Sequence, residues 1–149
     1  VHLGGQPMKS IFETAREDDR LSTSLRIVQV GEMVPLLDEV GEYTAFFPTN
    51  EAFSRFPAEV LHAVMVDRER LTSLIKYHVV QGKLTVQELA QMEAIRTLQG
   101  DHLEIEGGPE MVKVNDAAII QANVDCTNGM YHVIDQVLLP RAVEARVTR

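Results

Sequence analysis

Apolar residues recur at two different spacings along the chain, and the spacing changes near residue 94. Before that point they recur every three or four positions, which is typical of helices with one buried face. After that point apolar and polar residues alternate, which is typical of strands. Helices gathered in one half and strands in the other predict an α+β fold with antiparallel strand pairing.

Local signals place the helix boundaries in the first half. Ser10 and Thr85 each begin a capping-box pattern with a glutamate three residues later, and Asp67 can cap the helix that follows it. Gly31 and Pro35 divide the segment 21–41 into two short helices. The segment "RERLTSLIKYHVV" is predicted to be helical up to Gly82, and four of its residues share one face: Leu71, Leu74, Ile75 and His78.

Five segments of the second half are predicted to be strands. They are "AIRTLQG", "HLEIEG", "MVKV", "AAIIQANVDC" and "MYHVIDQVLL". Asn128 and Gly129 separate the last two, and Asn-Gly favours a tight hairpin turn. We therefore expect Gly129 to adopt a positive φ.

A joint between a strand and a helix is predicted in "EYTAFFPTNEAFSRF". The short aromatic run Tyr43–Phe47 is a strand that stops at Pro48, and helical spacing resumes at Ala52. Thr49 or Asn50 is expected to cap that helix. Thr49 could instead be a nucleophile, but a threonine in this position is more often an N-cap, so the joint is interpreted as structural.

Composition narrows the function classes. The 149 residues suit one domain, with 45% hydrophobic and 24% charged residues. The net charge of −8 and the lack of a basic stripe argue against nucleic-acid binding. Membrane insertion is not expected, because no apolar run approaches the ~18 residues of a spanning helix. Residues 1–9 are interpreted as an extension or a cloning remnant, 10–140 as the domain and 141–149 as a tail.

The candidate chemical groups do not define a reaction. Cys126 is the single cysteine, and the five histidines lack the spacing of a zinc site, so we expect no metal and no cofactor. His78 and His132 lie in apolar runs and are interpreted as structural. A proton-handling role with Asp135 stays open for His78, because His132 and Asp135 fall on opposite faces of a strand. We therefore expect no enzyme activity.

Three segments, in order, resemble the signatures of the fasciclin-like domain family. They are "YTAFFPTNEAFSRFP", "LIKYHVVQGKLT" and "NGMYHVIDQVLLP", and the resemblance extends from Ser10 to Pro140. It implies a wedge of two β-sheets packed with several short helices. It also implies that Thr49 and Asn50 tie the strand to the helix, with Asn50 in place of the commoner aspartate. The matching signature residues are Pro48, Thr49, Asn50, Phe53, His78, Gly129, His132 and Asp135.

The resemblance implies a non-catalytic adhesion or interaction domain that is secreted, periplasmic or on the cell surface, in a chain similar to bacterial members. The expected partner is a cell-surface or matrix protein or a polysaccharide. Tyr77 and His78 match the segment implicated in integrin binding in animal members, which makes them the adhesion candidates. Two alternatives stay open: a small-ligand or enzymatic role in a crevice between sheet and helices, and a structural spacer in a longer surface protein.

Overall fold

The computed structural model describes residues 9–108 and 111–140. The helices are α1 (Ile11–Ala15), the short 3-10 helix η1 (Asp19–Leu21), α2 (Ser22–Val30), α3 (Val34–Asp38), α4 (Asn50–Ser54), α5 (Ala58–Met65), α6 (Arg68–Tyr77) and α7 (Val86–Leu89). The strands are β1 (Tyr43–Pro48), β2 (Val79–Gln81), β3 (Ala94–Arg96), β4 (His102–Gly107), β5 (Val112–Val114), β6 (Ala117–Cys126) and β7 (Gly129–Ile134). Residues 1–8 and the expected tail, 141–149, lie outside the described residues.

The predicted α+β class is confirmed, but the pairing is mixed. The strands form one seven-stranded order, β2-β1-β7-β6-β5-β4-β3. Strands β1 and β7 run parallel, from Tyr43 opposite Gly129 to Pro48 opposite Ile134, and the other neighbours are antiparallel. The expectation of antiparallel pairing throughout is therefore wrong. A parallel pair needs a long crossover, and here most of the domain lies between the two strands.

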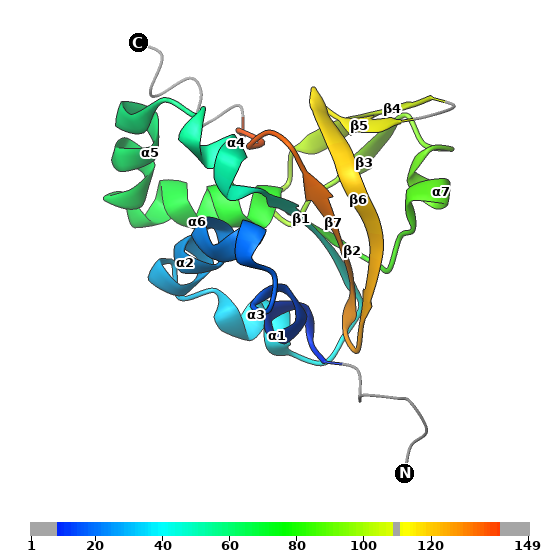
Figure 1. Ribbon diagram of the computed structural model, residues 1–149, viewed down its shortest axis with the longest axis horizontal. Coiled ribbons are helices and arrows are strands. Elements are labelled where there is room, and N and C mark those ends of the chain that lie inside the picture. The colour runs from blue at the N-terminus through cyan, green and yellow to red at the C-terminus, as the bar shows by residue number, and fades with distance from the viewer. Residues whose placement is uncertain (1–8, 109–110, 141–149) are drawn as a thin grey trace.

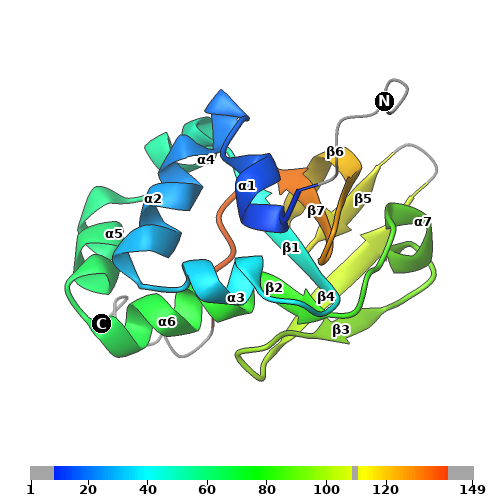
Figure 2. The same ribbon diagram turned by 90° about the horizontal axis from the view of Figure 1, so that it is seen from below.

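Two hydrophobic cores lie on opposite sides of β1 and β7. Ala45, Phe47 and Val133 pack against the helices α1–α6, which gather on one side of the sheet (Figure 1). Phe46 and Ile134 point the other way, into a second core with residues of β4, β5 and α7. Helix α7 accordingly lies away from the other helices, beside β3 and β4 (Figure 2).

The expected wedge of two sheets takes the form of one continuous sheet whose two ends enclose the second core. Strand β6 belongs to both halves, because its start pairs with β5 and the rest pairs with β7. Its register against β7 shifts twice, between Ile119 and Gln121 and between Gln121 and Val124. Such irregularities increase the local twist and bend of a strand. The bend at β6 thus allows one hydrogen-bonded sheet to form both faces of the wedge.

The helix starts were predicted correctly, but one helix ends earlier than expected. Ser10 and Thr85 form capping boxes, and Asp67 caps α6. Helix α6 stops at Tyr77, and Val79–Gln81 forms β2, which pairs with β1. The prediction of a helix up to Gly82 is wrong because an apolar run this short fits either a buried helix or a buried strand.

The hairpin before β7 is present, with a shifted turn. Cys126 pairs with Gly129, so Thr127 and Asn128 form the two-residue loop. Gly129 has a φ of 142°, which confirms the expected positive value. The reason is close packing across the parallel pair, since a Cβ on Gly129 would lie 1.8 Å from the carbonyl oxygen of Tyr43.

Throughout the two described ranges, every helix is too short to cross a bilayer. The longest of them, α6, has ten residues.

Candidate functional site

The joint after β1 is held by Thr49, whose side chain is buried. Its hydroxyl accepts a hydrogen bond from the Ala52 N–H at 3.1 Å, and its backbone N–H donates to the Ile134 carbonyl at 3.2 Å. Thr49 is therefore the N-cap of α4, and it also extends the pairing of β1 with β7. The hydroxyl is therefore used as a helix cap, which agrees with a structural joint.

Asn50 is the first residue of α4, so it does not cap that helix. Its Oδ1 accepts from the Thr23 N–H at 2.8 Å, and its Nδ2 donates to the Asp19 carbonyl and the Ser22 hydroxyl, both at 2.9 Å. Asn50 therefore ties the joint to the start of α2. Of the two residues expected as the cap, Thr49 accepts from α4, and Asn50 lies inside the helix.

We expect Thr49→Ala to lower the free energy of unfolding by about 1–2 kcal/mol, because the buried Ala52 N–H loses its acceptor. Ser54→Ala is the matched control, since its hydroxyl donates to the Glu51 carbonyl at an exposed position of the same helix. Denaturant unfolding of both variants measures the difference. Equal stability of Thr49→Ala and wild type would contradict a structural joint.

Asn50→Asp is expected to destabilise the domain by about 1 kcal/mol, because a carboxylate keeps the acceptor for Thr23 but loses the amide donor. The oxygen that replaces Nδ2 would then face the Asp19 carbonyl oxygen. Lowering the pH until the new carboxyl is protonated should recover part of the loss. An unchanged melting temperature at neutral pH would show that the amide donor contributes nothing.

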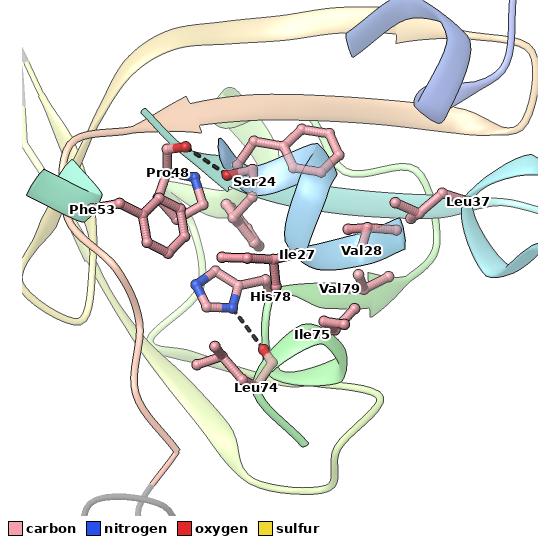
Figure 3. A pocket seen from close by; sticks show the side chains of 12 residues that line it. Ser24, Ile27, Val28, Leu37, Pro48, Phe53, Leu74, Ile75, His78 and Val79 are labelled. Atoms are coloured by element: carbon pink, nitrogen blue, oxygen red, sulfur yellow. Dashed lines mark hydrogen bonds between the residues drawn. The ribbon is translucent and has the colours of Figure 1, made fainter. Parts of the chain in front are cut away.

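His78 is buried at the end of α6 and joins two distant segments. Its Nδ1 lies 2.8 Å from the Leu74 carbonyl, and its Nε2 lies 3.0 Å from the Leu138 N–H (the Leu74 contact is drawn in Figure 3). A carbonyl only accepts and an N–H only donates, so the ring is neutral with its proton on Nδ1. Burial lowers the pKa of His78 to about 4, against a smaller opposing effect of the Leu74 bond.

Asp135 does not pair with His78. Its Oδ1 accepts from the Ala118 N–H at 2.8 Å, and its carbonyl accepts from the Arg55 guanidinium at 2.8 Å. The acid therefore fastens the end of β7 to β6 and α4. The proton-handling alternative for His78 and Asp135 is wrong, since both nitrogens of the ring already have backbone partners.

His132 lies on β7 and is fully buried. Its Nδ1 accepts from the Asn123 N–H at 3.0 Å, and its Nε2 donates to the Leu84 carbonyl at 2.9 Å. The ring stacks on Phe46 with centroids 5.6 Å apart. Burial lowers the pKa of His132, and the Leu84 bond opposes this in part. Like His78, it is a neutral imidazole that connects two backbone segments.

The two adhesion candidates do not face solvent. The side chain of Tyr77 is buried in the second core, and its hydroxyl donates to the His102 carbonyl at 3.0 Å. His78 is 8% exposed as a whole residue. Phe53, another signature residue, is buried in the first core. A partner that binds the folded domain would therefore meet the surroundings of these residues and not their side chains.

Three asparagines that the sequence reasoning did not single out as site residues hold loops together. Asn115 and Asn123 have φ values of 54° and 60°, in the left-handed region that asparagine tolerates. The Asn115 side chain accepts from Glu104 N–H and donates to the Tyr77 hydroxyl. The Asn123 side chain accepts from the Val86 N–H at 2.8 Å. The available signal was an asparagine beside or within a strand pattern, which usually marks a turn or bulge.

Asn128 is the most connected of the three. Its Oδ1 accepts from the Ile11 N–H at 2.9 Å, and its Nδ2 donates to the carbonyls of Leu37 and Glu39 at 2.9 and 3.0 Å. The residue is 3% exposed. It therefore joins the β6–β7 hairpin to α1 and to the end of α3.

An apolar pocket lies between the helices and the sheet, where the crevice alternative placed a ligand (Figure 3). Its volume is about 30 Å³, and its walls come from α2, β1, α4 and α6, with Ile27, Leu74 and Phe53 among them. The Ser24 hydroxyl at its edge donates to the Pro48 carbonyl at 2.7 Å. A space of this size holds about two water molecules, which is far below the volume of an ordinary ligand site.

Neither a reactive thiol nor a metal-binding cluster is found among the described residues. Burial raises the pKa of the Cys126 thiol, which makes it a poor nucleophile. Among residues 9–108 and 111–140, no cluster of three histidine, cysteine or acidic side chains could hold a metal ion. The polar signature side chains instead join separate backbone segments of the fold.

Comparison with known proteins agrees with this arrangement. The sequence profile of the Fasciclin domain matches residues 19–140. The chain is 37% identical over 133 residues to protein sll1483 of Synechocystis sp., covering 88% of this chain and 73% of that protein. It is 32% identical over 136 residues to transforming growth factor-beta-induced protein ig-h3 of Sus scrofa, covering 91% of this chain but 20% of that protein.

A solved structure shares the fold. It is that of a FAS1 domain pair from the insect cell adhesion molecule Fasciclin I, with a TM-score of 0.61 and 23% sequence identity over 84% of this chain and 47% of that chain. The profile match spans most of the chain and includes all three signature segments. The chain therefore belongs to the fasciclin domain family.

Proposed function

We propose that this domain is a non-catalytic adhesion or interaction module that works outside the cytoplasm, secreted, periplasmic or on the cell surface. The observation that carries the proposal is the match of the fasciclin domain profile to residues 19–140. The use of the signature side chains supports it: Thr49, Asn50, His78, His132 and Asp135 all hold backbone segments together. Groups fixed in this way build a scaffold for a surface.

The partner is a cell-surface or matrix protein or a polysaccharide, recognised by exposed residues. Tyr77 and His78 act on that surface indirectly, by fixing the elements around them, because both are buried. Tyr77→Phe separates a structural role of Tyr77 from direct partner binding, since it removes only the hydroxyl that donates to the His102 carbonyl. We expect the variant to lose stability and to keep partner binding at a temperature where it is folded.

The experiment places the folded domain on a surface and measures saturable binding to intact cells, matrix proteins and polysaccharides. The unfolded chain is the control for non-specific adhesion in this binding measurement. A thermal-shift screen of small molecules is carried out in parallel. Saturable binding that disappears on unfolding supports the module. A small molecule that raises the melting temperature, without any such binding, would favour the crevice alternative. If neither saturable binding nor a shift in melting temperature is observed, a structural spacer becomes the better description.

A further inference from the structure

The buried Asn128 side chain bonds to backbone groups of Ile11, Leu37 and Glu39, and we call this set of contacts the Asn128 hub. The hub requires an amide side chain. One oxygen accepts from Ile11, and one nitrogen donates to both Leu37 and Glu39. An aspartate could keep the acceptor but would place a second oxygen against two carbonyl oxygens. A serine or threonine would be too short to reach both sides. The packing therefore favours asparagine at position 128.

The next position requires glycine for an independent reason. Gly129 opens β7 opposite Tyr43 of the parallel strand β1. A Cβ there would lie 1.8 Å from the Tyr43 oxygen and 2.7 Å from its nitrogen, both backbone atoms that cannot move aside. The fold thus imposes Asn-Gly at 128–129 through two separate demands.

Asn-Gly is also the dipeptide most susceptible to deamidation of the asparagine. The glycine has no side chain to shield its nitrogen and moves freely in an unfolded chain. We propose that Asn128 is a deamidation site that folding closes and unfolding opens, so that a chain left unfolded loses the ability to return.

The reaction needs only the chain and water. The backbone nitrogen of Gly129 attacks Cγ of Asn128, and a nitrogen–carbon bond forms. The bond from Cγ to Nδ2 breaks, and ammonia leaves with the proton from the Gly129 nitrogen. Water then opens the five-membered succinimide at either carbonyl and gives aspartate or isoaspartate.

The folded structure opposes the first step. Both polar atoms of the Asn128 side chain are held, by partners on three different residues. The Asn128 carbonyl also accepts from the Tyr43 N–H at 3.0 Å, which fixes the backbone between the attacking nitrogen and the side chain. The residue is 3% exposed, so water has little access. Rotation toward the Gly129 nitrogen would break these contacts together.

The products do not fit the hub. Aspartate brings a negative charge into a buried site and cannot donate to Leu37 or Glu39. Isoaspartate routes the backbone through the former side chain, which adds one backbone atom to the two-residue loop and removes the amide that bonds Ile11, Leu37 and Glu39. Either product therefore prevents refolding, which makes unfolding irreversible through chemical change.

The other asparagines provide internal comparisons. Asn50, Asn115 and Asn123 precede Glu51, Asp116 and Val124, whose side chains hinder the attacking nitrogen. In the unfolded chain, we expect conversion at Asn128 well before conversion at these three. In the folded domain, Asn128 is expected to change at least about a hundredfold more slowly than in the unfolded chain, since few molecules are open at any time.

The test holds the purified chain at mildly alkaline pH, folded in buffer or unfolded in guanidinium, for increasing times. Mass spectrometry of peptides measures aspartate and isoaspartate at each asparagine, and circular dichroism after dilution measures the refolded fraction. The expected result is conversion at Asn128 in the unfolded sample alone, with a matching loss of refolded protein.

Either of two results in the wild-type time course would overturn the proposal. One is equal conversion of Asn128 in the folded and unfolded samples, which would show that the hub gives no protection. The other is full refolding of chains already converted at Asn128. The variant Asn128→Asp carries the aspartate product and gives a second readout: it should show no native melting transition, and a wild-type melting curve would contradict the claimed loss. The wild-type time course stands whether or not this variant folds.

Discussion

Gly129→Ala is expected to cost about 4 kcal/mol or more in the free energy of unfolding, enough to leave a marginally stable domain unfolded. The new Cβ would lie 1.8 Å from a backbone oxygen of β1, so the parallel pair must separate. The pair of Tyr43 and Gly129 begins the contact between β1 and β7. Circular dichroism and denaturant unfolding measure the loss.

Gly82→Ala is the matched control. Gly82 also has a positive φ, 98°, but a Cβ there would meet no atom within 4 Å. Its cost is therefore conformational alone, about 1–2 kcal/mol. A similar loss in both variants would show that backbone conformation, and not the close approach of β1, explains the need for glycine at 129.

Acid should weaken the domain through its buried histidines. The pKa of His78 is about 4 in the folded state and about 6.5 in an unfolded chain. The unfolded state therefore takes up a proton first as the pH falls. The stability linked to His78 is complete above pH ~6.5 and declines between about 6.5 and 4, by about 3 kcal/mol in total. Below pH ~4 both states are protonated, and this group adds no further loss.

His132 contributes in the same direction, because burial lowers its pKa as well. Free energies of unfolding measured from pH 7.5 to 4 should therefore fall more steeply than one histidine explains. His78→Gln, which cannot titrate, should flatten the profile in this window, whereas the exposed His102 makes His102→Gln a suitable control. An unchanged slope in His78→Gln, or an NMR titration of His78 near pH 6.5, would contradict the assignment of a buried neutral ring.

Local chemistry explains why the helix starts were predictable. Ser10, Thr85 and Asp67 cap their helices with side chains that reach only two or three residues along the chain. The aromatic strand before Pro48 was equally predictable, because its signal is a local run of mostly apolar residues. Strand β1 lies between the two hydrophobic cores, so both of its faces are buried. A strand that is buried on both faces has a nearly continuous apolar sequence.

Long-range geometry explains what the sequence did not reveal. Val79 and Val80 join β1 as a strand because an open edge is available there, and no local signal reports that edge. The parallel pairing of β1 with β7 joins residues more than 80 positions apart. The partners of His78 are backbone groups of Leu74 and Leu138, and side-chain patterns carry no information about such groups.

The asparagines show the same limit within the candidate site. Asn50 was identified through its place in a signature, but its contacts to Asp19, Ser22 and Thr23 come from a segment that folds back on the joint. Asn128 was identified as a turn residue, which is correct, while its role as a hub depends on Ile11 and Leu37. Both roles become visible only when distant segments meet.

The position of β7 between two anchors has a mechanical consequence. At its start, the Asn128 side chain and the Thr127 N–H hold the segment Lys9–Ile11. Beyond its end, the His78 ring holds Leu138. A tension applied between residues 9 and 140 would therefore act along β7 and shear it against β1 and β6, loading many hydrogen bonds at once. In the adhesive role proposed above, β7 would be the strand that carries the load between the two anchors.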